Sequence, residues 1–226
     1  MKRSEINAAI RWAMDMLQSR GVRLPALAYW SPEELHARRH DIGAVRRLAL
    51  GWDVTDFGSG DFANIGAVLY TVRNGLIDDS SIGVPYCEKY IVMRDGQRMP
   101  SHYHAFKTED IINRFGGSLA IRLWNVVPGT IRLLDTDVIV DMDGFRRSIP
   151  AGEEIYVQSG ESVTLAPNVA HQISSKKGSG YLILGEVSRV NNDNTDNFFL
   201  DGAPRFTKVE DDEPPIHLLC NEYPPV

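Results

Sequence analysis

After about residue 50 the chain becomes a series of short β-branched and aromatic runs that end at glycine, and this pattern constrains the fold most. The runs include ANIGAVLYTVRNG, EKYIVMRDGQRMPSHYH, SLAIRLWNVV, DVIVDMDGFRRSI and GYLILGEVSRV. Short strands at even spacing, joined by turns such as Asp-Gly, are typical of antiparallel sandwiches and barrels. We therefore expect a mainly β barrel over residues 51–226, with a proline-rich and acid-rich C-terminal tail that wraps it.

The N-terminal part has helical periodicity. Apolar residues recur at helical spacing over residues 6–17, Ser4 is the expected N-cap and Gly21 ends the run. A second helix is expected after Ser31, because Glu34 three residues later completes a capping box. We expect residues 1–50 to form a helical arm that packs on the barrel, within a single structural domain.

Composition excludes several classes of protein. The net charge is −6 and no basic run is present, which argues against nucleic acid as a partner. No apolar run approaches the ~20 residues of a membrane span, and the N-terminus lacks the pattern of a signal peptide. Cys87 and Cys220 belong to no CxxC or zinc pattern. We expect a cytoplasmic protein with neither a membrane nor a nucleic-acid partner.

The segment GQRMPSHYHAFKTEDIINRFG contains two histidines two residues apart. Alternate residues of a strand share a face, so His102 and His104 are expected to point the same way. Glu109 has the opposite parity to His104. A turn or bulge over residues 105–107 is therefore needed to bring Glu109 to the same metal ion.

His171, which follows a proline turn in LAPNVAHQI, is the candidate for a third imidazole. Three imidazoles and one carboxylate suit Mn²⁺, Fe²⁺, Co²⁺, Ni²⁺ or Zn²⁺, and they leave room for substrate oxygens. The sequence therefore predicts a metal site built from His102, His104, Glu109 and His171.

The spacing of this segment resembles the first cupin motif at every position. The motif has a glycine, an HxH pair, a glutamate and a second glycine, which here are Gly96, His102, His104, Glu109 and Gly116.

The segment from Gly160 to His171 resembles the second cupin motif and keeps its glycine-to-histidine spacing. It departs from that motif in three ways. Pro167 lies one residue late, the internal glycine is absent, and Ser175 replaces the expected asparagine.

Nearly the full length of the chain resembles the D-lyxose isomerase family of cupin-fold sugar isomerases. The resemblance rests on MKRSEIN, AYWSPEE, SHYHAFKTEDIINRFGG, GEVSRVNNDNTDN and DEPPIHLLCNEY. It implies a cupin-type double-stranded β-helix (jelly-roll) barrel with an N-terminal helical extension. It also implies a homodimeric, metal-dependent aldose–ketose isomerase that favours Mn²⁺. Such an enzyme interconverts D-lyxose and D-xylulose, and D-mannose and D-fructose.

Aldose–ketose isomerisation moves a hydrogen between C1 and C2, so it needs a base and a stabilised oxyanion. Glu186, near the end of the apolar run LILGEVS, is the candidate general base. Lys107 is the candidate for proton handling or oxyanion and substrate binding, with a pKa lowered by a nearby dication. Related sugar isomerases place substrate-facing groups in the tail, so Arg205 is a candidate for substrate binding and Glu213 for catalysis.

Two interpretations of the remaining polar residues stay open at this stage. Asp193, Asp196 and Asn197 suit sugar hydroxyls, but NNDNTDN is equally ordinary loop chemistry. The same ligand set also fits an Fe²⁺-dependent cupin dioxygenase or a non-catalytic sugar-binding cupin. Polyol chemistry needs polar groups such as Lys107 and Glu186, whereas oxygen activation favours an apolar pocket.

Overall fold

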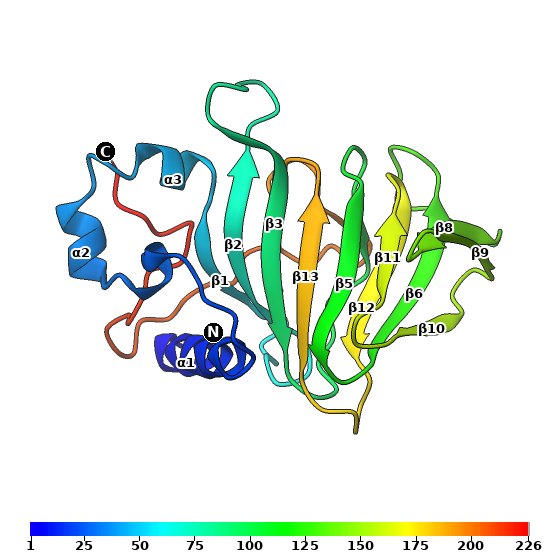
Figure 1. Ribbon diagram of the computed structural model, residues 1–226, viewed down its shortest axis with the longest axis horizontal. Helices are drawn as coiled ribbons and strands as arrows, with labels where there is room; N and C mark the ends of the chain where they lie inside the picture. Colours follow the sequence, from blue (N-terminus) through cyan, green and yellow to red (C-terminus); the bar gives the residue numbers. More distant parts are fainter. Residues whose placement is uncertain (226) are drawn as a thin grey trace.

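The computed structural model describes residues 1–225 and is built mainly from β-strands in two curled, facing sheets (Figure 1). The helices are α1 (Arg3–Ser19), the 3₁₀ helix η1 (Ala26–Tyr29), α2 (Pro32–Ala37) and α3 (Gly43–Arg47). The strands are β1 (Gly51–Thr55), β2 (Ala67–Gly75), β3 (Gly83–Met93), β4 (His102–Tyr103), β5 (Glu109–Gly116), β6 (Leu119–Val126), β7 (Leu133–Leu134), β8 (Val138–Met142), β9 (Phe145–Ile149), β10 (Glu154–Val157), β11 (Ser162–Leu165), β12 (Val169–Ser175), β13 (Leu182–Ser188) and β14 (Phe198–Phe199).

Strands from distant parts of the chain alternate in both sheets. The eight-stranded sheet has the order β1-β2-β3-β13-β5-β11-β8-β9, and the six-stranded sheet has the order β10-β6-β12-β4-β14. The late strand β13 lies between β3 and β5, and β12 lies between β6 and β4, with antiparallel pairing throughout. This interleaving is that of a jelly roll and confirms the predicted cupin-type barrel.

Apolar side chains from both sheets fill the space between them. Ile91, Met93 and Ile111 from the eight-stranded sheet belong to one buried cluster with Ile121 and Ile173 from the six-stranded sheet. Alternation along each strand sends every second residue inward, which is why the strands carry these residues at period two. Polar residues at the inward positions of the same strands therefore face an enclosed space.

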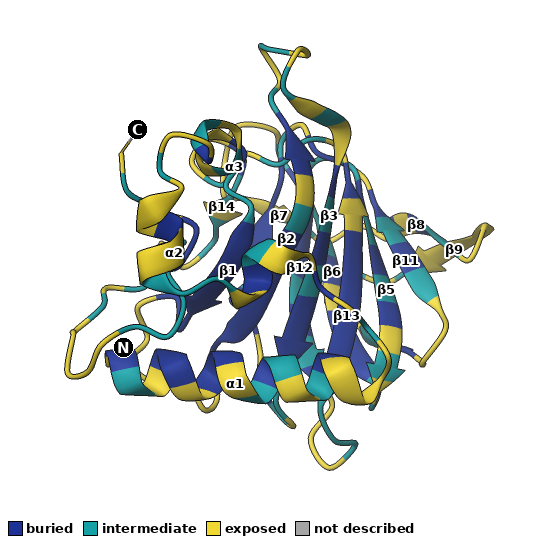
Figure 2. Ribbon diagram, turned by 60° about the vertical axis from the view of Figure 1, so that its left-hand side comes forward, coloured by how far each residue is buried: buried dark blue, intermediate teal, exposed yellow. Residues whose placement is uncertain are grey.

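Helix α1 lies against the outer face of the eight-stranded sheet and directs its buried side toward it (Figure 2). Ile6, Ile10 and Leu17 on this helix belong to the same buried cluster as Tyr70 on β2 and Ile183 on β13. No helix among residues 1–225 is both long and apolar enough to cross a membrane.

The two helix starts differ in how well the sequence predicted them. Ser31 and Glu34 form the predicted capping box, in which each side chain bonds the backbone N–H of the other residue. The prediction for α1 was wrong by two residues, because Lys2 is the N-cap and has no side-chain cap. The hydroxyl of Ser4 instead donates to Asp212 at 2.6 Å, so a tertiary contact replaces the local one.

The C-terminal tail runs back along α1 and β1. Buried Arg3 contacts the carboxylates of Asp211 at 2.9 Å and Glu222 at 2.5 Å, and the main chain of Leu219 bridges to Trp52 on β1. The hydroxyl of Thr55, also on β1, donates to the carbonyl of Arg205 at 3.1 Å. These contacts fix where the tail leaves the barrel.

Candidate active site

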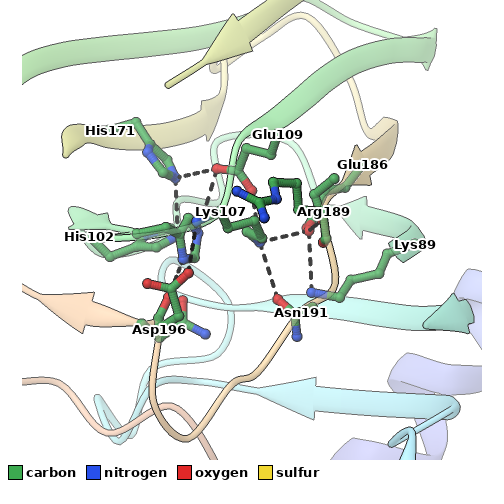
Figure 3. Close-up of polar contacts among 12 residues, drawn as sticks. Lys89, His102, Lys107, Glu109, His171, Glu186, Arg189, Asn191 and Asp196 are labelled. Carbon is green, nitrogen blue, oxygen red and sulfur yellow. Dashed lines mark hydrogen bonds and ion pairs between the residues drawn. The ribbon is translucent and has the colours of Figure 1, made fainter. Parts of the chain in front are cut away.

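Three imidazoles meet in a pocket between the two sheets (Figure 3). His102 on β4 pairs directly with His171 on β12, and His104 follows β4. Each ring offers a nitrogen within 4.8 Å of the others, and all three side chains are buried. The three-histidine group could hold a metal ion, as the HxH spacing and the later histidine predicted.

The outer nitrogen of each ring is held by a main-chain carbonyl. Nδ1 of His102 contacts the carbonyl of Pro100 at 3.0 Å, and Nδ1 of His171 contacts that of Val169 at 3.1 Å. Nδ1 of His104 contacts the carbonyl of a residue in a distant loop, Asp196. A carbonyl only accepts, so each Nδ1 carries the proton and each Nε2 presents a lone pair to the pocket.

Lone pairs of the imidazole nitrogens and of the Glu109 carboxylate converge at the centre of the site. Nε2 of His171 lies 3.1 Å from Nε2 of His102 and 3.2 Å from Oε1 of Glu109. Oε1 is buried and has no hydrogen-bond partner among the described residues. Such an arrangement of acceptors is unfavourable unless a cation sits among them. Two nitrogen ligands about 2.1 Å from one ion and at right angles lie about 3 Å apart, so these residues fit a divalent metal.

The local environment keeps these groups in the state that binds a metal. Burial and then the neighbouring imidazoles hold the pKa of His102 well below its usual value. Burial and then the ammonium of Lys107 lower the pKa of His104 to about 4. Burial raises the pKa of Glu109, but the ammonium of Lys107 and the imidazoles lower it well below the usual range. Near neutral pH His102 and His104 are therefore neutral and Glu109 is ionised.

Beside these ligands lies a buried ion-paired cluster. Nζ of Lys107 lies 2.9 Å from Oε2 of Glu109 and 2.9 Å from Oε1 of Glu186, and it donates to Asn191 at 3.2 Å. Glu186 lies on β13, where it is buried while the next residue, Val187, is exposed. Side chains alternate along a strand, so Glu186 points inward.

The charges in this cluster reinforce each other. Burial raises the pKa of Glu186, but Lys107 and then Lys89 outweigh burial and lower the pKa below its usual value, so Glu186 is ionised. We expected a dication to lower the pKa of Lys107. In the protein itself burial does lower it, but Glu109 and Glu186 outweigh burial and raise it above its usual value. Among the protein's own groups Lys107 is therefore protonated and acts as a hydrogen-bond donor.

Arg205 enters the pocket from the tail and lies between two carboxylates. Its Nη1 is 2.6 Å from Oδ2 of Asp53 on β1, and its Nε donates to Asp193 at 3.1 Å. Burial raises the pKa of Asp193, but Arg205 and then Lys89 lower it well below its usual range. The guanidinium is thereby fixed at the pocket wall.

The comparison with known proteins decides the family. The family model described as D-lyxose isomerase matches residues 1–223. The chain belongs to the D-lyxose isomerase family. This confirms the resemblance found in the sequence, and it makes the protein an enzyme, an aldose–ketose isomerase.

Curated members of the D-lyxose isomerase family cover almost the whole chain. The D-lyxose/D-mannose isomerase of Escherichia coli O157:H7 is 40% identical over an alignment of 230 positions, which covers 99% of this chain and 98% of that protein. The D-lyxose/D-mannose isomerase of Serratia proteamaculans is 40% identical over 226 residues, with the same coverage of both chains.

Solved structures of similar fold are more distant in sequence. The L-ribose isomerase of Acinetobacter sp. DL28, in complex with L-ribose, covers 93% of this chain with a TM-score of 0.63 and 14% identity. The L-ribose isomerase of Cellulomonas parahominis, also with L-ribose, has a TM-score of 0.58 and 13% identity. Because the sequence identity is so low, this likeness shows only that the present chain shares the fold of these L-ribose isomerases.

The structure brings most of the predicted site residues together and leaves one outside. The predicted residues that line the pocket are His102, His104, Lys107, Glu109, His171, Glu186 and Arg205. Glu213 does not line it. Its exposed carboxylate accepts a hydrogen bond from Asn7 of α1 at 2.6 Å, because the tail turns away along that helix after Arg205.

Lys89 is buried on β3 and lines the pocket, although it was not among the predicted site residues. Its ammonium donates to Oε1 of Glu186 at 3.3 Å. A signal was present, because Lys89 shares its strand parity with Ile91 and Met93 and therefore had to face inward. A lysine on the buried side of an apolar strand is rare unless it has a partner or a function.

Proposed function

We propose that the enzyme interconverts D-lyxose with D-xylulose, and D-mannose with D-fructose, at a divalent ion held by His102, His104, Glu109 and His171. The observation that carries this proposal is the convergence of unpaired ligand atoms on one point beside the buried Lys107–Glu186 pair. The names of the two curated relatives support the choice of sugars. D-lyxose and D-mannose share the configuration at C2 and C3 and differ in chain length, so one pocket serves both.

The proposed ion is Mn²⁺, because the family resemblance implies it; the donor set also suits Co²⁺, Ni²⁺, Fe²⁺ and Zn²⁺. A divalent ion bound there would stabilise the negative charge that develops on the sugar oxygens at C1 and C2.

Glu186 is the proposed base. Its three hydrogen bonds from described residues, given by Lys107, Lys89 and Ser188, all go to Oε1. Oε2 is thus left for the substrate. In this mechanism the carboxylate takes the proton from C2 and returns it to C1, while a second proton passes from the C2 hydroxyl to the C1 oxygen.

The cations of the pocket are proposed to bind and orient the sugar. Lys107 keeps its proton and donates to a sugar oxygen near the reacting carbons. Its proposed role is therefore to stabilise the oxyanion. Lys89 has Glu186 as its one hydrogen-bond partner among the described residues, so its ammonium retains donors for hydroxyls. Arg205, Asp193 and Asn191 line the same pocket and offer donors and acceptors for the rest of the chain.

The test measures turnover of the protein with a known bound metal and without oxygen. The protein is stripped with a chelator, reloaded with Mn²⁺ and incubated anaerobically with D-lyxose, D-mannose and D-xylose, and ketose is assayed. We expect ketose from D-lyxose and D-mannose and its loss on renewed chelation. Protein that binds Mn²⁺ but forms no ketose from any of the sugars would refute the isomerase proposal and bring forward the dioxygenase alternative.

The proposed assembly is a homodimer, as the family resemblance implies. Light scattering of the Mn²⁺-loaded protein tests this, with a mass near twice the 25.3 kDa of the chain as the expected result.

A further inference from the structure

The predicted turn between the two metal-binding segments is present, and it crosses from one sheet to the other. His104 follows β4 of the six-stranded sheet, and Glu109 begins β5 of the eight-stranded sheet. The residues between them form a bend without regular structure, and Lys107 lies on it. The relative placement of His104, Lys107 and Glu109 therefore depends on how this turn is held.

One carboxylate from a distant loop holds the turn. Oδ1 of Asp196 accepts hydrogen bonds from the backbone N–H groups of Ala105 at 2.6 Å and Phe106 at 3.1 Å, and Oδ2 accepts one from Lys107 at 3.0 Å. Asp196 is only 5% exposed. Hydrogen bonds to an ionised acceptor are about twice as strong as neutral ones, so this residue fixes all three peptide planes.

The same residue also orients one metal ligand. The main-chain carbonyl of Asp196 accepts the Nδ1 proton of His104. His102 and His171 each bond the carbonyl two residues earlier in their own segment, so the chain around them sets their orientation locally. His104 differs from them because its orientation depends on a loop about 90 residues later in the chain.

We propose that Asp196 is a positioning residue that sets the metal affinity of the site and the placement of Lys107. The inference rests on the proposed metal-dependent isomerisation. Asp196 acts through the turn and through His104. Its loop also carries Asn191 and Asp193, which line the pocket. Asp196 therefore joins the metal-binding side to the sugar-binding side, where Figure 3 shows Asn191.

A matched control lies on the surface of the same protein. The carboxylate of exposed Asp95 also accepts hydrogen bonds from backbone N–H groups, those of Gly178 at 2.9 Å and Gly180 at 2.9 Å. It does not line the pocket. Asp95→Ala therefore removes a similar carboxylate-to-backbone contact without touching the site.

The experiment titrates Mn²⁺ into chelator-stripped wild type, Asp196→Ala, Asp196→Asn and Asp95→Ala by calorimetry, and follows kcat and KM for D-lyxose. Asp196→Ala removes the carboxylate that holds the turn, but it keeps the main-chain carbonyl that accepts from His104. Loss of an outer partner of a metal site typically weakens metal binding about 10–100-fold, so we expect about 10-fold, the lower end of that range, for Asp196→Ala. Asp196→Asn keeps one acceptor oxygen but turns an amide toward the N–H of Lys107, so we expect a smaller loss. Asp95→Ala should stay within about twofold of wild type in affinity and kcat.

Each outcome decides the inference. An Asp196→Asn protein with wild-type Mn²⁺ affinity and kcat would overturn it, and this variant decides alone if Asp196→Ala does not fold. A lower melting temperature in Asp196→Ala with unchanged Mn²⁺ affinity would also overturn it, because Asp196 would then be only structural. Wild type that binds Mn²⁺ but makes no ketose would refute the isomerase function, whereas the affinity series would still decide the role of Asp196.

Discussion

Replacing Lys89 by methionine removes one cation from the buried cluster at similar side-chain volume. The ammonium lies 3.3 Å from Oε1 of Glu186, and both side chains are almost fully buried. At an effective dielectric constant of about 20 this pair is worth about 5 kcal/mol. Breaking a buried pair costs about 3–5 kcal/mol, and Lys107 still neutralises Glu186 at 2.9 Å. We therefore expect Lys89→Met to lose about 3 kcal/mol of unfolding free energy near pH 7.

The pH dependence of this loss follows from the direction of the pKa shift. The folded-state pKa of Glu186 lies below its ordinary value of 4.5, because Lys107 and Lys89 outweigh burial. Its ionisation therefore stabilises the fold above the unfolded pKa, and this contribution is lost as the pH falls through the folded pKa. Without Lys89 the folded pKa rises and the contribution shrinks. The difference in unfolding free energy between wild type and Lys89→Met should accordingly narrow as the pH falls through the folded pKa of Glu186, which lies below 4.5 in wild type.

Urea unfolding of metal-stripped proteins, followed by circular dichroism near pH 7 and near pH 4, measures both quantities. Lys177→Met is the control, because Lys177 is exposed and makes no ion pair among the described residues. We expect it to stay within about 0.5 kcal/mol of wild type. A loss below about 1 kcal/mol for Lys89→Met near pH 7, or a larger loss near pH 4 than near pH 7, would refute the electrostatic argument.

Three further predictions concern the ligands, the base and the motif glycines. His171→Ala should weaken Mn²⁺ binding by at least about 100-fold and abolish turnover with it; a fully active variant would contradict the ligand set. Glu186→Gln should bind Mn²⁺ as wild type does, while kcat falls by about 10²–10⁴; unchanged kcat would move the base role elsewhere. At Gly116, φ is +104° and an added Cβ would lie 2.0 Å from the carbonyl oxygen of Tyr181, whereas at Gly96, with φ of +75°, the nearest atom is 3.5 Å away. Gly116→Ala should therefore cost about 3 kcal/mol or more and Gly96→Ala about 1–2 kcal/mol in urea unfolding, and equal losses would show that the clash is relieved.

The β-rich barrel could be predicted from the sequence, because strand periodicity and turn glycines are local properties of the chain. The sequence also pointed to His102, His104, Glu109 and His171, since a short-range HxH spacing fixes which side chains share a face. The capping box at Ser31 was predictable for the same reason, because its partner lies three residues away.

The distant groups that complete the site could not be predicted, because the fold brings them together. The Asp196 contact to residues 105–107 and the Asp53 contact to Arg205 join segments about 90 and 150 residues apart, and no local pattern encodes such pairs. Glu213 lay outside the pocket because tail contacts with α1 set its path. The charge state of Lys107 likewise depended on two carboxylates from different strands, whose combined field outweighs burial.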